Sequence, residues 1–372
     1  MREKELRLAL VCYGGISLAV YMHGITKEIW NFARASRNFH EGQGEAQSGA
    51  LAVYQDLLST ISTDGKLHMR VIIDIIAGAS AGGINGIFLA QAIETGQSLE
   101  PLTDLWLDNA DVEKLLDPDA RPAARFTKFW AQPIVWLAAR RKGDAVERTV
   151  SPETREEVRH KLSSFVRSRW FQPPFGGKTF TKLLLDAFDS MASAKRERAL
   201  LPFSHPLDLM VTVTDFEGYP EMLRLNSPPE VREMEHRLTI QFRTKMRQGT
   251  LADSAELVFA ARATASFPGA FPPFTVRELD KVLARMNRYW PGRERFLARA
   301  LPKQSGLGKA ESAVLSDGSV LSNAPFAPAI MALKDRPARR EIDRRFVYID
   351  PKPTTGRAFA FNRNNKSKNG AN

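Results

Sequence analysis

The sequence predicts an α/β fold with a mostly parallel central sheet, and two observations predict it. Residues 6–12 and 71–77 are predominantly apolar runs of strand length, which is typical of strands that are buried on both faces. Each run is followed by a glycine-containing turn and then by apolar residues at helical spacing, over residues 17–33 and 84–93. Strand, turn and helix therefore occur twice in the same order, which indicates parallel strands joined by helices that cover the sheet.

The rest of the chain completes this architecture. Residues 99–206 are mostly helical in pattern and carry several prolines, so we interpret them as a helical insertion or cap. Strand character returns in three short segments, residues 207–214, 313–315 and 346–349. The tail, residues 357–372, is rich in Asn and Lys, has no periodicity and is expected to be disordered. The simplest organisation is one domain over residues 1–356 that includes the insertion.

The chain is basic. Its 372 residues include 53 Lys and Arg against 42 Asp and Glu, which gives a formal net charge of +11 and a pI near 9.8. This surplus favours an anionic partner, either nucleic acid or an anionic membrane surface. Because the sequence contains neither a zinc finger nor an RNA-binding aromatic signature, we do not expect it to bind nucleic acid.

Cysteine and histidine usage limits the chemistry further. The single cysteine, Cys12, excludes an internal disulfide framework and suits a reducing compartment. The six histidines are scattered and show no paired ligand spacing, so we expect no metal and no cofactor.

An uncharged segment near the start raises the question of export. Residues 8–25 contain no Asp, Glu, Lys or Arg. Gly14 and Gly15 interrupt the segment, acidic residues precede it, and no clean small-residue cleavage site follows. We interpret it as a buried strand, a glycine turn and a buried helix. The sequence thus predicts a cytoplasmic protein that contacts membranes peripherally.

A serine motif stands directly behind the second predicted strand. It reads Gly78-Ala79-Ser80-Ala81-Gly82. A serine between small residues at a strand-to-helix turn is the arrangement that exposes a hydroxyl as a nucleophile. A glycine-rich turn can also serve close packing alone, so the motif needs support from other residues.

A nucleophilic serine needs a base within hydrogen-bond reach. In α/β-hydrolases that base is a histidine near the end of the chain, but the last histidine here is His236. The strongest downstream acid is Asp317, which ends an apolar stretch and precedes Gly318, a residue that permits a sharp turn. An ordinary Asp-Gly turn would also explain this pair. Because no histidine is well placed, the sequence favours a dyad of Ser80 and Asp317.

Gly14 and Gly15 are candidates for stabilising negative charge. They lie between the first predicted strand and the helix that follows, so their N–H groups could point toward an oxyanion. Tight packing of strand and helix explains the pair equally well. A nucleotide site is unsupported, since neither turn has a Gly-Lys-Ser/Thr ending or a G-x-G-x-x-G pattern.

Taken in this order, the glycine loop, G-x-S-x-G and the late Asp-Gly resemble the patatin-like phospholipases, over about residues 6–350. Residues 263–273, ATASFPGAFPP, are similar to the family's segment before its Asp-Gly motif, and residues 317–325, DGSVLSNAP, resemble the extended Asp-Gly motif. Within the family, the chain is most similar to bacterial patatin-related proteins with a long additional C-terminal region. The resemblance implies a three-layer α/β/α fold and metal-independent hydrolysis of lipid acyl esters, as a phospholipase A, a lysophospholipase or an esterase.

The resemblance also implies a role for each matching residue. Ser80 would be the nucleophile and Asp317 its base, and the oxyanion would be held by N–H groups of Gly14, Gly15 and Ala81. The usual loop of the family has three glycines followed shortly by a basic residue, whereas this chain has two. We therefore expect an oxyanion hole of different shape.

Two basic stretches that contain aromatic residues are candidates for membrane contact. They are residues 125–142 and 277–303. Ordinary solvated helices whose aromatic residues pack inward would give the same pattern. The expected partners are a phospholipid or another lipid ester and an anionic membrane surface. The alternative function is a weakly active or inactive protein of this fold that binds anionic membranes.

Overall fold

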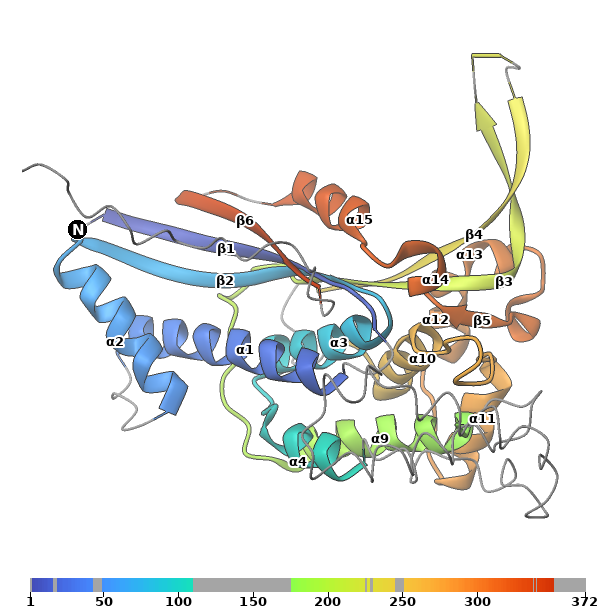
Figure 1. Cartoon of the computed structure of the whole chain (residues 1–372), viewed down its shortest axis with the longest axis horizontal. Helices are drawn as coiled ribbons and strands as arrows, with labels where there is room; N and C mark the ends of the chain where they lie inside the picture. Colours follow the sequence, from blue (N-terminus) through green and yellow to red (C-terminus); the bar gives the residue numbers. More distant parts are fainter. Residues whose placement is uncertain are drawn as a thin grey trace, which may run out of the picture.

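One sheet of six strands runs through the molecule, in the order β4-β3-β2-β1-β6, with β5 paired to β3 (Figure 1). The strands are β1 (Arg2–Cys12), β2 (Leu67–Gly78), β3 (Asp208–Arg224), β4 (Glu230–Arg243), β5 (Leu315–Asp317) and β6 (Glu341–Ile349). β1 pairs in parallel with β2 and β6, and β2 pairs in parallel with β3, whereas β4 and β5 pair antiparallel with β3. The sheet is thus mostly parallel, as the sequence predicts.

The computed structural model describes residues 2–15, 19–42, 49–109, 175–224, 226–227, 230–244, 251–336, 338 and 340–350.

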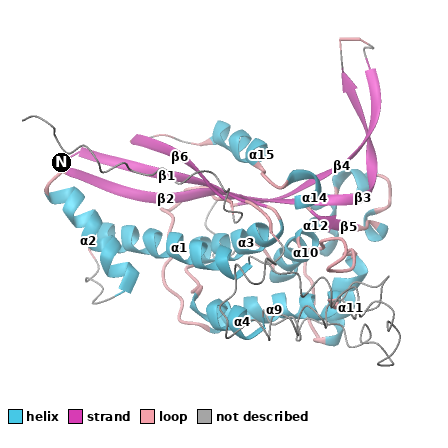
Figure 2. Cartoon of the chain, in the orientation of Figure 1, coloured by secondary structure: helices cyan, strands magenta, loops and turns pink. Residues whose placement is uncertain are grey.

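Helices lie on both faces of this sheet, which gives three layers, α/β/α (Figure 2). One face is covered by α1 (Ala19–Glu41), α2 (Gly49–Thr63), α3 (Ser80–Thr95) and α10 (Ser254–Thr264), with α4 (Glu100–Asn109) and α9 (Gly177–Ser193) packed outside them. The other face carries α14 (Ser319–Ser322) and α15 (Phe326–Met331). The other helices in the described part of the chain are α11 (Val276–Arg285), α12 (Arg293–Ala300) and α13 (Pro302–Gly306), and short 3₁₀ turns cover Ala310–Ser312 and Ala332–Asp335.

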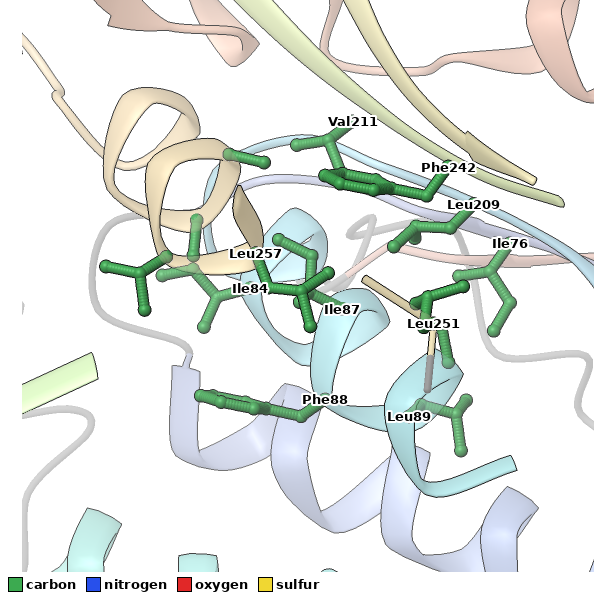
Figure 3. Close-up of a cluster of buried hydrophobic side chains, with 14 of the residues drawn as sticks. Ile76, Ile84, Ile87, Phe88, Leu89, Leu209, Val211, Phe242, Leu251 and Leu257 are labelled. Atoms are coloured by element: carbon green, nitrogen blue, oxygen red, sulfur yellow. The ribbon is translucent and has the colours of Figure 1, made fainter. Parts of the chain in front are cut away.

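The main hydrophobic core lies between the sheet and α3 (Figure 3). Ile76, Leu209 and Phe242 belong to β2, β3 and β4, and they join Ile87 and Phe88 of α3 in one buried cluster. Every residue of α3 is buried. A helix that is enclosed on all sides is fixed by its packing rather than by its own propensity. The first residue of this helix is therefore held rigidly at the edge of the core.

Both predicted strand, turn and helix units are confirmed, as β1 with α1 and β2 with α3. The short strand segments predicted further along correspond to β3, β5 and β6. β4 escapes prediction because the first half of the strand is polar and exposed, and only its second half alternates between buried and exposed residues. At that exposed end, β3 and β4 pair only with each other and form an arm that projects from the sheet (Figure 1).

Two of the predicted segments fall wholly or partly outside the described residues. These are the tail, residues 357–372, and residues 110–174 of the helical insertion. The described ends of the insertion, α4 and α9, are helical. Among the residues that the structure describes, no helix is both long and apolar enough to cross a bilayer.

A buried carboxylate ties β2 to β6. Asp74 accepts a hydrogen bond from Arg344 at 3.0 Å, and the Nε2 atom of His205 lies 3.1 Å from the same carboxylate oxygen. Arg336 donates to the Asp74 carbonyl oxygen at 2.9 Å and pairs with Asp208. Burial opposes the charged form of Asp74, but the hydrogen bonds from His205 and Arg344, with the charges of Arg344 and Arg336, outweigh it and hold the pKa at about 2. This cluster fastens the edge strand to the centre of the sheet.

We expect Asp74→Asn to lower the free energy of unfolding by about 3–5 kcal/mol at pH 7, because the largely buried Arg344 loses its carboxylate partner and Arg336 keeps only Asp208. A carboxylate whose pKa is lowered by folding stabilises the fold above its unfolded pKa of about 3.9 and loses that contribution as the pH falls toward its folded pKa. The difference between wild type and variant should therefore narrow below about pH 4 in urea denaturation.

Asp343→Asn is the matched control, since it removes a carboxylate from a more exposed pair with Arg345, and it should change the free energy of unfolding by less than about 1 kcal/mol. A difference between wild type and Asp74→Asn that does not change with pH would contradict the role of the Asp74 charge.

Candidate active site

Ser80 occupies a sharp turn between β2 and α3. β2 ends at Gly78, and α3 begins at Ser80 itself. The backbone φ of Ser80 is +50°, in the left-handed region that residues other than glycine rarely adopt. The N–H of Ser80 donates to Thr264 Oγ1 at 2.8 Å, and that hydroxyl donates in turn to the Thr212 carbonyl oxygen at 2.7 Å. These two bonds hold the serine backbone in its unfavourable conformation.

The two glycines of the serine motif allow the backbone to pack more closely than any side chain permits. A Cβ atom at Gly78 would lie 2.7 Å from the carbonyl oxygen of Gly82. One at Gly82 would lie 2.4 Å from the carbonyl oxygen of Cys12, at the end of β1. The close packing of this turn also supports Ser80, because it brings the loop after β1 beside that residue.

Asp317 reaches Ser80 from a distant part of the chain. It ends β5, which pairs antiparallel with β3. Ser80 Oγ donates to Asp317 Oδ2 at 2.6 Å, a contact that spans 237 positions of the sequence. The other carboxylate oxygen accepts from the Ser319 N–H at 2.7 Å, and the Asp317 N–H donates to the Ser266 carbonyl oxygen at 3.1 Å. A Cβ atom at Gly318 would lie 2.0 Å from a carbonyl oxygen of β3, so only glycine fits after the aspartate.

The surroundings of the pair make Asp317 a stronger base than an ordinary aspartate. Asp317 is 0% exposed and Ser80 is 5% exposed. Burial raises the pKa of Asp317, and the hydrogen bonds from Ser80 and Ser319 offset only part of that rise. The nearby Cys12 thiol does not compete as a nucleophile, because burial raises its pKa to about 12 and keeps it protonated.

The glycine loop after β1 lies directly against Ser80. A Cβ atom at Gly14 would sit 2.7 Å from the Cβ of Ser80 and 2.9 Å from that of Ser319. The Gly14 N–H donates to Asn323 Oδ1 at 2.7 Å. Gly15 follows at once, and residues 16–18 lie outside the described part of the chain. The structure thus brings the loop to the nucleophile, with its first amide paired within the protein.

Ala81 is the second residue of α3. Amides in the first turn of a helix have no acceptor within that helix, and the helix dipole favours negative charge at this end. The side chain of Ala81 is buried beside Ser80, so its amide shares the same shielded surroundings. The Ala81 N–H is therefore a candidate donor to an oxyanion that forms at Ser80.

Exposed apolar side chains lie on the two helices that follow the glycine loop and Asp317 in the chain. Val20 and Tyr21 begin α1, just after the glycine loop, and they are 41% and 51% exposed. Val320 and Leu321 belong to α14, just after Asp317, and they are 47% and 49% exposed. We call these four residues the apolar rim.

Sequence reasoning gives no role to four residues that complete the site, namely Thr212, Thr264, Ser319 and Asn323. Thr264 and Asn323 stand inside the two segments that carry the family resemblance, and this position is the signal that could find them. Ser319 could be found from its place two residues after an aspartate, where an Asx turn is expected. Thr212 gives no signal, because it takes part through the carbonyl of a central strand.

Comparison with known proteins identifies the family. A buried serine and aspartate at a strand-to-helix turn suit nucleophilic attack on an ester carbonyl. Residues 42–330 match the patatin-like phospholipases, and the chain belongs to this family. The matched range includes Ser80 and Asp317 and begins after the glycine loop.

The chain is also similar to a much longer protein, the uncharacterized membrane protein Rv3479 of Mycobacterium tuberculosis. The two are 28% identical over 362 residues, which is 94% of this chain and 27% of that protein. The chain therefore spans about a quarter of the length of this relative. The relative's name describes it as a membrane protein and states no activity.

Proposed function

We propose that this chain hydrolyses lipid acyl esters through a dyad of Ser80 and Asp317 and an acyl-enzyme intermediate. One observation carries the proposal, the 2.6 Å hydrogen bond from Ser80 Oγ to a carboxylate that is fully shielded from solvent. Family membership supports a lipid ester as the substrate class.

In the first half of the proposed reaction, Ser80 Oγ attacks the ester carbonyl carbon while its proton passes to Asp317 Oδ2. The carbonyl oxygen becomes an oxyanion, for which the N–H groups of Gly15 and Ala81 are the proposed donors, because the Gly14 N–H, also expected from the sequence to be a donor, is already bonded to Asn323. The alcohol then leaves with the proton from Asp317. In the second half, Asp317 takes a proton from water, the resulting hydroxide adds to the acyl-enzyme, and Ser80 regains the proton as the fatty acid departs.

The apolar rim supports a substrate with an acyl chain. Burial of apolar surface contributes about 25 cal/mol per Å², so an acyl chain that covers the rim gains binding energy that a short polar ester cannot. Phospholipids, lysophospholipids and simple fatty-acid esters all carry such a chain. Phospholipase A, lysophospholipase and esterase activities are therefore the three forms of the proposed function.

Peripheral membrane contact is proposed for the exposed side of α11. Arg277, Lys281 and Arg285 recur every fourth residue and are exposed, so they share one side of the helix. Trp290 and Phe296 of the same basic stretch are 5% and 1% exposed and pack inward. The contact is therefore mainly electrostatic, and Tyr289, which is 86% exposed, is the aromatic residue of this stretch that is available to it. The other basic stretch, residues 125–142, lies outside the described residues.

Reversal of these three charges tests the contact. The triple variant Arg277→Glu, Lys281→Glu and Arg285→Glu should bind vesicles of phosphatidylglycerol and phosphatidylcholine more than about 10-fold more weakly, since a basic residue near such a surface contributes about 1 kcal/mol. Binding is measured by co-sedimentation, with vesicles of phosphatidylcholine alone as the control. If the triple variant bound anionic vesicles as tightly as the wild type, α11 would take no part in the membrane contact.

Substitution of either dyad residue should abolish hydrolysis without unfolding the protein. We expect Ser80→Ala to reduce turnover by at least about 10³-fold and Asp317→Asn by roughly 10²-fold or more. The measurement is fatty-acid release from a panel of phospholipids, lysophospholipids and simple esters by mass spectrometry, with circular dichroism as the check on folding. Thr63→Ala, which removes an exposed hydroxyl at the end of α2, is the matched control. Turnover at the wild-type rate in either dyad variant would reject the dyad.

The alternative function, an inactive protein that binds anionic membranes, draws support from the Gly14 amide, which is already paired with Asn323. A fluorophosphonate probe separates the two functions. Labelling that disappears in Ser80→Ala supports the hydrolase, whereas absence of labelling together with strong binding to anionic vesicles supports the alternative.

The raised pKa of Asp317 predicts the acidic limb of the pH profile. The base acts in its charged form, so kcat/KM should fall as the pH drops through the pKa of Asp317 in the free enzyme. Because burial raises that pKa, the fall should occur above pH 3.9, the ordinary value for aspartate. Initial rates with a neutral, soluble ester between pH 3 and pH 8 measure it. A profile that stays flat down to about pH 4 would argue against a buried carboxylate as the base.

A further inference from the structure

The short segment from Asp317 to Asn323 contacts both halves of the site. At its start, Asp317 accepts the hydrogen bond from Ser80 Oγ. At its end, Asn323 accepts one from the N–H of Gly14 at 2.7 Å. The helix α14 lies between them, and the hydroxyl of Thr212 donates to the Ser322 carbonyl oxygen at 3.0 Å, which fastens this helix to β3. Base and glycine loop are therefore placed by one rigid connection.

The bond from Gly14 to Asn323 changes what the glycine loop can do. A backbone amide has one hydrogen, so a bond of 2.7 Å to a side-chain oxygen commits the Gly14 N–H to the protein. Gly14 also has no room for a side chain, because a Cβ atom there would lie 2.9 Å from Asn323 Oδ1 and 2.7 Å from the Ser80 Cβ. The first glycine of the loop is therefore an attachment point, which leaves Gly15 as the next amide along the loop.

We propose that Asn323 is a positioning residue for the oxyanion hole. By holding Gly14, it fixes the loop so that the N–H of Gly15, together with that of Ala81, faces the carbonyl oxygen of a substrate bound at Ser80. Asn323 acts through Gly14 and does not touch the substrate. The inference rests on the proposed hydrolase function. It names Asn323 as the residue that lets a loop with only two glycines present an amide to the oxyanion.

Two leucine substitutions separate the loss of the hydrogen bond to Gly14 from the effect of adding a leucine side chain to this segment. Asn323→Leu keeps the size of the side chain and removes the hydrogen-bond acceptor. We expect kcat to fall by about 10-fold to 100-fold and KM to stay nearly unchanged, because the variant loses stabilisation of the oxyanion in the transition state and not binding of the substrate. The affinity for a trifluoromethyl ketone, which forms an oxyanion with the serine, should fall by the same factor. Ala324→Leu adds the same side chain at the next, exposed position and should leave kcat unchanged.

Hydrogen exchange gives a readout that does not depend on catalysis. The amides of residues 13–15 should exchange faster in Asn323→Leu than in the wild type. In Asn323→Asp, which retains an oxygen acceptor, they should keep their protection. Equal exchange in the wild type and Asn323→Leu would overturn the attachment.

A rise in kcat of Asn323→Leu would also overturn the proposal, since it would mean that Asn323 blocks the Gly14 amide instead of placing the loop. Failure of the hydrolase itself has a different signature. A wild-type protein that hydrolyses no ester, while Asn323→Leu still loses loop protection, would reject the hydrolase and leave the attachment of Gly14 standing.

Discussion

The candidate site depends on how closely separate backbone segments approach one another. The loop after β1 approaches the turn after β2 and the segment after β5 at distances that leave no room for a Cβ atom at Gly14 and Gly82, and the turn after β5 approaches β3 in the same way at Gly318. The hydrogen bond between Ser80 and Asp317 can form only once these backbones are in place. The chemistry of the site is therefore set at the level of the main chain, and a shift of one segment displaces the others.

Two buried aspartates in this sheet have pKa values shifted in opposite directions, because their surroundings differ. Asp74 and Asp317 are both 0% exposed. Burial opposes the charge of Asp74, but the hydrogen bonds from His205 and Arg344 and the charges of Arg344 and Arg336 hold its pKa at about 2, so its carboxylate stays ionised. Asp317 receives hydrogen bonds from Ser80 and Ser319, and burial raises its pKa, so its carboxylate can exchange a proton. Identical side chains thus differ in function because of their neighbours.

The parts of the fold that follow from local pattern could be predicted, and the parts that follow from distant contacts could not. The apolar runs that become β1 and β2, with the glycine turns behind them, define the parallel sheet and locate Ser80. The absence of a late histidine points to Asp317 as its partner. The hydroxyl of Thr264 and the amide of Asn323 enter the site only through contacts across 184 and 309 positions of the sequence, and no spacing rule encodes such contacts. The arm of β3 and β4 lacks the apolar alternation on which strand prediction depends.

The pairing of β1 with β6 has a consequence for how the protein is made. β1 lies between β2 and β6, and the N–H of Tyr13, immediately before the glycine loop, donates to the carbonyl oxygen of Ile349 at 3.0 Å. During synthesis, residues 4–12 are made more than 330 residues before residues 341–349, with which they pair. A nascent chain therefore carries Ser80 long before it carries either Asp317 or β6, the strand that holds the glycine loop. The site can therefore assemble only after β5 and β6 have been synthesised, which is long after the strands and the helix that hold Ser80.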